Sequence, residues 1–242
     1  MAFEPETKVS NLALKTNGNS LAEDLPQSAE HPNPASNDAS ETSETGKRKY
    51  PSHAVLRAEL ETPMIDQDLQ LSTTEKQELI EKSVREILVA LGLDIDDDSL
   101  SGTPKRVAKM YVNELFSGLK PETAPAISLF ENKYEYGNML VERDIEVQSM
   151  CEHHLMPIIG KAHVAYIPSD HVIGLSKINR IVQYFSQRPQ VQERLTNQIA
   201  EYMKETLKTD HVAVIVDSVH YCVKMRGIKY SCSSTLTRRV SP

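Results

Sequence analysis

The sequence predicts an α+β domain built on an antiparallel sheet, and three observations support this fold class. Strand-like segments follow one another without an intervening helix over residues 125–168. Two long helical patterns then fill residues 174–208, and strand-like patterns return over residues 211–226. Grouped strands and grouped helices are typical of α+β folds, whereas parallel α/β folds alternate the two regularly.

Composition limits the class of protein. The chain has 242 residues, 39% of them hydrophobic and 25% charged, which suits one soluble domain with a tail. The net charge of −7 argues against a nucleic-acid partner, and no apolar run approaches the roughly 20 residues of a membrane span. The N-terminus lacks the layout of a secretory signal, and three cysteines do not make a disulfide framework. We therefore expect a cytoplasmic protein that has no membrane partner and keeps its thiols reduced.

Residues 1–70 are expected to form a disordered N-terminal tail. This part of the chain is rich in Ser, Asn, Glu, Pro and Thr and has few aliphatic side chains. Such a segment buries too little apolar surface to offset the entropy lost on ordering.

Residues 71–120 are expected to form a helical part that contains two helices. Ser72 and Glu75 have the spacing of a capping box, and Gly92 marks the end of the first helix. Thr103 is expected to cap the second helix, with Pro104 at its first position and Gly118 at its end. The apolar positions with helical spacing are Ile80, Val84, Ile87, Leu88 and Leu91 in the first helix, and Val107, Tyr111 and Leu115 in the second.

Residues 121–242 are expected to form the sheet domain. The expected strands cover residues 125–130, 138–150, 160–168, 211–219 and 220–226, and the expected helices cover residues 174–187 and 189–208. No internal repeat is present.

The stretch "MCEHHLMP" places a thiol, a carboxylate and two imidazoles at four consecutive positions. Cys151 and His154 are three apart, a spacing at which a tight turn directs both side chains to one point. Polar groups of this kind are costly to bury without partners. A single C-x-x-H pair is weak support for a metal, so a further ligand must come from elsewhere in the chain.

The stretch "VHYCVKMR" offers that ligand. As a strand it would direct alternate side chains to one face, namely His220, Cys222, Lys224 and Arg226. Cys222 would then complete a set of two thiolates and one imidazole, which suits a catalytic zinc with an open fourth position. An alternative is that Cys232 is a fourth ligand and the zinc is structural. An open zinc lowers the pKa of a bound water, and His153 and His220 would flank the ion and transfer protons.

The helix that begins "GLSKINR" has the features of an anion site. Ser176, Lys177 and Arg180 fall within about one quadrant of the helix, opposite its apolar side. Free backbone N–H groups in the first turn favour anions, and Arg226 is available from the expected strand. A cationic pocket in an acidic protein indicates a small polyanionic ligand. The alternative is an amphipathic helix with a solvated polar face.

Gln192 and Glu193 lie early in the next helix, away from its apolar stripe. An amide beside a carboxylate can read the edge of a base, and a carboxylate that faces N1–H and the exocyclic amine prefers guanine. Helix-surface Gln and Glu are common, so this pair alone is a weak signal.

Five stretches together resemble the GTP cyclohydrolase I family. They are "CEHHL", "GKAHVAYIP", "VIGLSKINRIVQYFSQRPQVQERLTNQIA", "DSVHYCVKMRGI" and, in the helical part, "GTPKRVAKMYVNELFSGL". The resemblance covers about residues 75–229. It implies the T-fold, a four-stranded antiparallel sheet with two helices on one face, preceded by a helical hairpin and assembled into an oligomeric barrel. Members are typically homodecamers with active sites where subunits meet.

The resemblance also implies a role for each matching residue. It makes Cys151, His154 and Cys222 the ligands of a Zn²⁺ cofactor. It assigns His153 and His220 to proton transfer, with Glu152 supporting the metal turn. It assigns Gln192 and Glu193 to guanine, and it assigns Ser176, Lys177, Arg180, Arg226 and Arg106 to the triphosphate and ribose. Ser176 would also assist the rearrangement of the ribose.

The implied reaction is hydrolysis of the C8–N9 and C8–N7 bonds of GTP, followed by ring rearrangement to 7,8-dihydroneopterin triphosphate with loss of formate. This reaction begins folate and tetrahydrobiopterin synthesis, and a regulatory protein is a further candidate partner. One feature departs from the family, because the chain ends "TRRVSP" where a turn and a C-terminal helix usually follow. This shortened, atypical C-terminus recommends an alternative, a non-catalytic GTP-binding subunit. Another T-fold synthase or reductase is disfavoured by the combined guanine and phosphate motifs.

Overall fold

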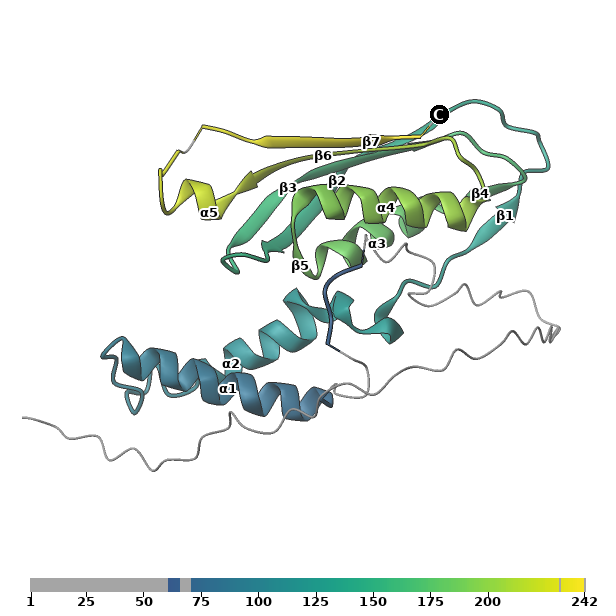
Figure 1. Ribbon diagram of the computed structural model, residues 1–242. Coiled ribbons are helices and arrows are strands. Elements are labelled where there is room, and N and C mark those ends of the chain that lie inside the picture. The colour runs from purple at the N-terminus through teal and green to yellow at the C-terminus, as the bar shows by residue number, and fades with distance from the viewer. Residues whose placement is uncertain (1–60, 66–70, 231, 242) are drawn as a thin grey trace, which may run out of the picture. The chain divides into compact units, whose positions relative to one another are not determined.

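The computed structural model describes residues 61–65, 71–230 and 232–241. The expectation of a disordered tail over residues 1–70 therefore falls almost entirely outside the described residues. Within those residues the chain forms a helical part followed by a sheet domain (Figure 1).

Helix α1, Thr73–Ala90, begins and ends where the sequence predicts. The capping box is confirmed, because the Ser72 hydroxyl accepts the Glu75 N–H at 3.3 Å and the Glu75 carboxylate accepts the Ser72 N–H at 2.8 Å. Gly92 follows the helix with a φ of 79°, the left-handed conformation that ends many helices. The apolar stripe is only half covered. Ile87 and Leu91 remain 57% and 70% exposed, and no α1 residue is fully buried.

Helix α2, Thr103–Met110, starts one residue before the predicted position. Gly102 is its N-cap, so the assignment of Thr103 as the cap was wrong. The Thr103 hydroxyl instead accepts a hydrogen bond at 2.8 Å from the Arg106 guanidinium. The chain continues as a π-helical turn η4, Tyr111–Leu115, and two 3₁₀ turns, η5 at Ser117–Leu119 and η6 at Pro121–Thr123.

The main sheet has five strands in the order β5-β2-β3-β6-β7. Their bounds are β2 Leu140–Cys151, β3 Pro157–Tyr166, β5 Pro189–Gln190, β6 Val212–His220 and β7 Thr235–Val240. The four long strands pair antiparallel, and the two-residue β5 pairs parallel to the end of β2. A separate two-stranded ladder joins β1, Leu129–Glu131, to β4, His171–Ile173.

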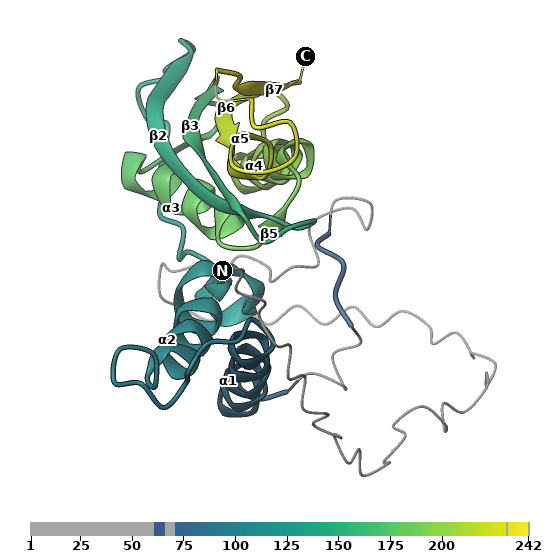
Figure 2. The ribbon, with the colours of Figure 1, turned by 90° about the vertical axis from the view of Figure 1, so that its left-hand side faces the viewer.

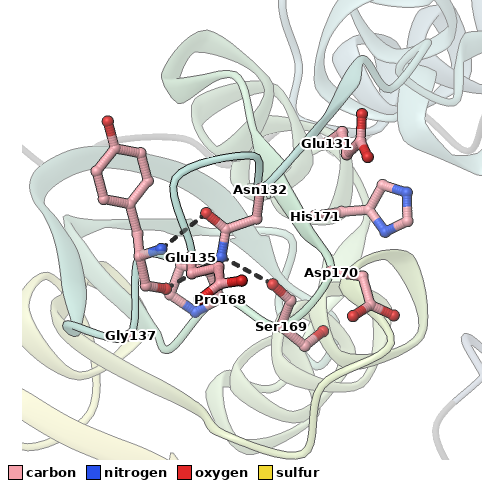
Figure 3. A pocket seen from close by; sticks show the side chains of 9 residues that line it. Glu131, Asn132, Glu135, Gly137, Pro168, Ser169, Asp170 and His171 are labelled. Atoms are coloured by element: carbon pink, nitrogen blue, oxygen red, sulfur yellow. Dashed lines mark hydrogen bonds between the residues drawn. The ribbon is translucent and has the colours of Figure 1, made fainter.

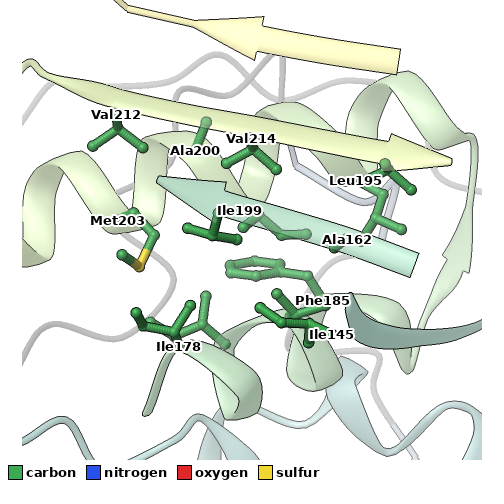
Figure 4. Close-up of a cluster of buried hydrophobic side chains, with 14 of the residues drawn as sticks. Ile145, Ala162, Ile178, Phe185, Leu195, Ile199, Ala200, Met203, Val212 and Val214 are labelled. Carbon is green, nitrogen blue, oxygen red and sulfur yellow. The ribbon is translucent and has the colours of Figure 1, made fainter. Parts of the chain in front are cut away.

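Two helices, α3 (Leu175–Ser186) and α4 (Gln192–Leu207), pack on one face of this sheet (Figures 1 and 2). Alternate strand residues and the apolar sides of both helices interdigitate in one core (Figure 4). Its fully buried members include Val147, Val164, Val214, Ile178, Phe185, Leu195 and Ile199. In the described part of the chain, no helix combines the length and apolarity that crossing a membrane requires.

The α+β class and the antiparallel pairing are confirmed, but the prediction of a strand over residues 220–226 was wrong. Strand β6 ends at His220, and Tyr221–Lys224 form a short helix, α5. The last ladder pair joins His220 to Ile158, and β3 begins only one residue earlier at Pro157. Among the described residues, no ladder pair of β6 extends past His220. The next strand along the chain is β7, which the sequence analysis did not predict.

Candidate metal centre

The turn between β2 and β3 places the first group of candidate ligands. Cys151 is the last residue of β2, and its carbonyl accepts the N–H of Leu155 at 2.8 Å. The Cys151 N–H donates to the carbonyl of Met156 at 2.8 Å, which closes the turn on both sides. Leu155 takes a left-handed φ of 49°. The result is a tight reversal in which the Cys151 side chain is buried and that of His154 is exposed.

Cys222 joins this turn from α5. One ligand atom each from Cys151, His154 and Cys222 lies within 4.8 Å of the others. The sequence placed these three residues together by assuming a strand, whereas the structure does so with a helical turn directly after β6. Among the described residues, Cys232 does not belong to this group. Two thiolates and one imidazole form a donor set that suits zinc in its preferred tetrahedral coordination.

The surroundings of Cys222 raise the pKa of its thiol. Burial raises its pKa, and the neighbouring Cys151 raises it further through a hydrogen bond and through its charge. A divalent cation between the two sulfurs would act in the opposite direction, because it stabilises the thiolates that bind it.

Two further predicted site residues contact the cluster. His153 Nδ1 lies 3.7 Å from the sulfur of Cys151. Arg226 approaches from the other side, with Nη1 2.6 Å from Nε2 of His154. A guanidinium can only donate, so Nε2 of His154 accepts in this contact. The structure thus brings both residues to the candidate ligands, whereas the sequence analysis expected His153 there and assigned Arg226 to the anion site.

Glu152 is held by a residue that the sequence analysis did not single out. Arg194, in the first turn of α4, makes a two-pronged ion pair with the Glu152 carboxylate at 2.6 and 3.3 Å. The Glu152 N–H also donates to the Gln190 carbonyl at 3.0 Å. These contacts anchor the 151–154 turn to the start of α4. A single arginine on a helix gives no sequence signal for such a role.

His220 ends β6 and lies against the same helix. Its Nε2 is 2.7 Å from Oε1 of Gln192. Burial lowers the pKa of His220, and the charge of nearby Glu193 partly opposes that shift. The neutral imidazole is therefore favoured. Gln192 is 1% exposed, whereas Glu193 is exposed.

Three of the five predicted anion-binding residues, Ser176, Lys177 and Arg180, lie on α3, whose N-terminus is at the opposite end of the sheet. Ser176 and Lys177 occupy the first turn of α3, which follows directly after Ile173, and the Ile173 N–H donates to the hydroxyl of Tyr166 at 3.3 Å. Tyr166 ends β3, whereas the metal turn precedes the start of β3, and a strand of this length spans roughly 30 Å. No hydrogen bond or ion pair of the described residues joins Ser176, Lys177 or Arg180 to the cysteine cluster.

Arg106 lies in the helical part. Its guanidinium donates to the Ser99 carbonyl at 3.3 Å and to the Thr103 hydroxyl at 2.8 Å. It has no described contact with the cysteine cluster, so its assignment to the substrate stays a prediction.

A hollow lies among the loops next to β1 and β4, away from the cysteine cluster (Figure 3). Asn132 ties these loops together, because its amide donates to the carbonyls of Tyr136 and Ser169 at 3.1 and 2.9 Å. Its side-chain oxygen accepts the Tyr136 N–H at 2.9 Å. The Asn132 amide is therefore used to shape the loops, which suits a structural role for this hollow.

The family model and the curated relatives agree on one family. The family model for GTP cyclohydrolase I matches residues 80–241. A protein of Flavobacterium johnsoniae named GTP cyclohydrolase 1 is 55% identical over 175 residues, which cover 72% of this chain and 78% of the relative. A protein of the same name from Yersinia enterocolitica is 54% identical over 184 residues, 76% of this chain and 83% of the relative. Among solved structures, that of the archaeosine synthase QueF-Like in the apo form is similar with a TM-score of 0.36 and 18% identity, covering 43% of this chain and 92% of that one.

Proposed function

The chain belongs to the GTP cyclohydrolase I family, and from that premise we propose that it hydrolyses GTP to 7,8-dihydroneopterin triphosphate and formate. The observation that carries the proposal is the convergence of Cys151, His154 and Cys222 on one point. Relatives above 50% identity are named GTP cyclohydrolase 1, and the similarity reaches residue 241. Nothing in these comparisons favours the alternative of a non-catalytic subunit.

The cofactor proposed for this cluster is Zn²⁺. Two sulfurs and one imidazole nitrogen are soft and borderline donors that fit zinc better than a hard cation such as magnesium. Three protein ligands leave the fourth tetrahedral position for solvent or substrate, the pattern of catalytic sites. Zinc held there would supply Lewis acidity and an activated water for hydrolysis of the guanine imidazole ring.

His153 and His220 are the proposed proton-transfer residues. His153 is exposed, with Nδ1 3.7 Å from the sulfur of Cys151 and Nε2 3.8 Å from the Glu152 carboxylate, and it is the group proposed to protonate N7 of the ring. His220 is favoured in its neutral form by burial, so it has a lone pair with which to accept a proton. Glu152, locked by Arg194, would hold the turn that carries His153.

Glu193 is the proposed reader of guanine. It is exposed in the first turn of α4, and its charge reaches His220. A carboxylate can accept hydrogen bonds from N1–H and the exocyclic amine together. Gln192, the other predicted base reader, is buried and stays a prediction in that role.

The triphosphate is proposed to bind at the start of α3, through Ser176, Lys177 and Arg180, with Arg226 and Arg106 contributing. Ser176 would also assist rearrangement of the ribose. The twelve residues of α3 span roughly 18 Å and separate its N-terminus from the metal end of the sheet. One GTP molecule therefore reaches both groups best if the phosphate site belongs to a second copy of the chain.

We also propose that the chain assembles into a T-fold barrel, as the homodecamer that is typical of the family. Within the described residues, Leu140–Ser149 of β2 pair only with β3, and β7 pairs only with β6. Two long strand edges thus expose unpaired N–H and C=O groups, which barrel closure with neighbouring copies would satisfy. A cytoplasmic location, a product used for folate or tetrahydrobiopterin, and a regulatory partner remain part of the same proposal.

The test is release of formate from GTP by the purified full-length chain. We expect formate and a pterin triphosphate in equal amounts, loss of both after zinc is removed by a chelator, and recovery when zinc is restored. GTP binding without any formate release from the zinc-loaded chain would contradict the proposal and favour the non-catalytic alternative.

A further inference from the structure

The buried side chain of Gln192 is the centre of a hydrogen-bond network that joins α4, β6 and β7. Gln192 is 1% exposed. The amide nitrogen lies 2.7 Å from the carbonyl oxygen of Thr235, 3.0 Å from that of Val216 and 3.2 Å from the hydroxyl of Thr237, and its two hydrogens are shared among these three acceptors. The amide oxygen faces Nε2 of His220 at 2.7 Å. Every polar atom of the Gln192 side chain therefore has a protein partner.

The orientation of this amide is determined by its acceptors. Two of the three groups that face the nitrogen are backbone carbonyls, which can only accept. Turning the amide over would place its oxygen against the carbonyl oxygens of Val216 and Thr235, so the amide would lose both of these hydrogen bonds. Oε1 of Gln192 is therefore fixed toward His220.

This orientation selects one tautomer of His220. An amide oxygen accepts hydrogen bonds and donates none, so the Nε2 that faces it must carry the hydrogen. In the neutral ring, Nδ1 then holds the lone pair, because the hydrogen bond made by one ring nitrogen sets the state of the other. Nδ1 is then the ring nitrogen of His220 that can accept a hydrogen bond.

Strand β7 reaches the histidine through the same network. The Thr196 hydroxyl donates to the Gln192 carbonyl at 2.8 Å and lies 2.6 Å from the Thr237 hydroxyl. The Thr237 hydroxyl can therefore donate to Thr196 while it accepts from the Gln192 amide. This closed ring of hydrogen bonds ties the Gln192 amide to β7.

We propose that Gln192 is a positioning residue that holds His220 in the Nε2–H tautomer, and that β7 maintains this state through Thr235 and Thr237. The inference rests on the proposed function only in that His220 is the proton-transfer group there. It adds a role for the C-terminal strand, which would control which nitrogen His220 offers to the substrate.

The direct test is ¹⁵N NMR of the zinc-loaded, full-length protein labelled at histidine, at about pH 8, where imidazoles are neutral. The chain has eight histidines, so the His220 signals are assigned by their loss in His220→Asn. We expect a protonated Nε2 and an unprotonated Nδ1. A protonated Nδ1 with a bare Nε2 would overturn the proposal, whether or not the protein turns over GTP. This measurement on the unmutated protein therefore stands even if the proposed function fails.

Gln192→Met is the matching variant, because it keeps the length of the side chain and removes both polar atoms. We expect mixed His220 tautomers and a kcat lowered about 10- to 100-fold, with the KM for GTP roughly unchanged.

The control is Thr196→Val, which removes a buried hydrogen bond of the same network without touching His220. It should keep the Nε2–H tautomer. A higher KM with an unchanged His220 spectrum in Gln192→Met would overturn the proposal and assign Gln192 to the guanine instead. If Gln192→Met does not fold, the spectrum of the unmutated protein decides.

Discussion

At the residue scale, the candidate metal centre depends on the thiol that α5 contributes. Replacing it by a hydroxyl in Cys222→Ser removes a soft ligand while keeping the volume, so we expect zinc to fall from about one ion per chain to nearly none. Formate release should fall with it, while the circular dichroism spectrum stays close to that of the unmutated chain. Zinc is measured by elemental analysis of the dialysed protein.

Cys232→Ser is the control for this substitution, because Cys232 is exposed and lies outside the ligand cluster. It should retain both zinc and activity. Loss of zinc from Cys232→Ser, or full zinc content in Cys222→Ser, would show that the ligand set is wrong.

A defect in the proposed phosphate site should raise the KM for GTP and leave the zinc content unchanged. Arg180→Ala removes a guanidinium whose hydrogen bonds to an anion are worth about 1.5–3 kcal/mol. We therefore expect the KM for GTP to rise about 10- to 100-fold, while zinc content stays unchanged. Steady-state kinetics with GTP measure the effect, and Arg85→Ala on the exposed face of α1 serves as the control. Equal turnover of GTP and guanosine by the unmutated chain would refute the assignment of a triphosphate site.

Some site residues could be predicted from the sequence and others could not. Cys151 and His154 form a local C-x-x-H motif. Cys222 could be proposed as the third ligand because the stretch "VHYCVKMR" offers a further thiol. The contact of Arg194 with Glu152 and that of Gln192 with His220 join residues 42 and 28 positions apart. Such pairs depend on how α4 packs against the sheet, and no local spacing records them.

At the element scale, the pairing of β3 with β6 holds the metal centre together. It brings Cys222, which follows β6, next to the turn before β3 that carries Cys151 and His154. Gly160 of β3 lies directly opposite Ser218 of β6. A methyl group at Gly160 would meet the backbone of Asp217 and Ser218, which cannot move without breaking the ladder. We expect Gly160→Ala to lower the free energy of unfolding by about 3 kcal/mol or more. Thermal unfolding at fixed chain concentration measures this decrease.

Gly137→Ala is the control for the strand prediction. A Cβ at Gly137 meets no atom within 4 Å, so Gly137→Ala should change the free energy of unfolding by no more than about 0.5 kcal/mol. Equal stability of the two variants would contradict the packing described for β3 and β6.

The elements also show where sequence patterns stop being informative. The capping box and Gly92 place α1 well, because both signals are local. Alternation over "VHYCVKMR" predicted a strand past His220, yet a strand exists only where a neighbour can pair with it, and β3 begins at Pro157. The two-residue β5 is too short for any pattern. Strand β7 was missed because the Ser-rich "SCSSTLTRRV" has little apolar alternation.

At the scale of the whole molecule, the separation of the metal and phosphate groups predicts sites shared between copies. Cys222→Ser and Arg180→Ala chains are each expected to be weakly active alone. Coexpressed in equal amounts, they should regain about a quarter of full activity, because random assembly pairs one intact metal half with one intact phosphate half in about a quarter of sites. Formate release by the mixed assembly measures this.

Coexpression of Cys222→Ser with His154→Ala is the control, because both defects fall in the metal half. That mixture should remain inactive. A Cys222→Ser and Arg180→Ala mixture that gains nothing, although native mass spectrometry shows mixed assemblies, would mean that each site lies within one chain.

The central claim is a zinc ion held by two sulfurs and one imidazole with one position left open, and X-ray absorption at the zinc edge tests it most directly. We predict two sulfur neighbours at about 2.3 Å and two light neighbours, nitrogen or oxygen, at about 2.0–2.1 Å. Three sulfur neighbours would place Cys232 on the metal and make the site structural. That result would contradict the account of an open, catalytic centre.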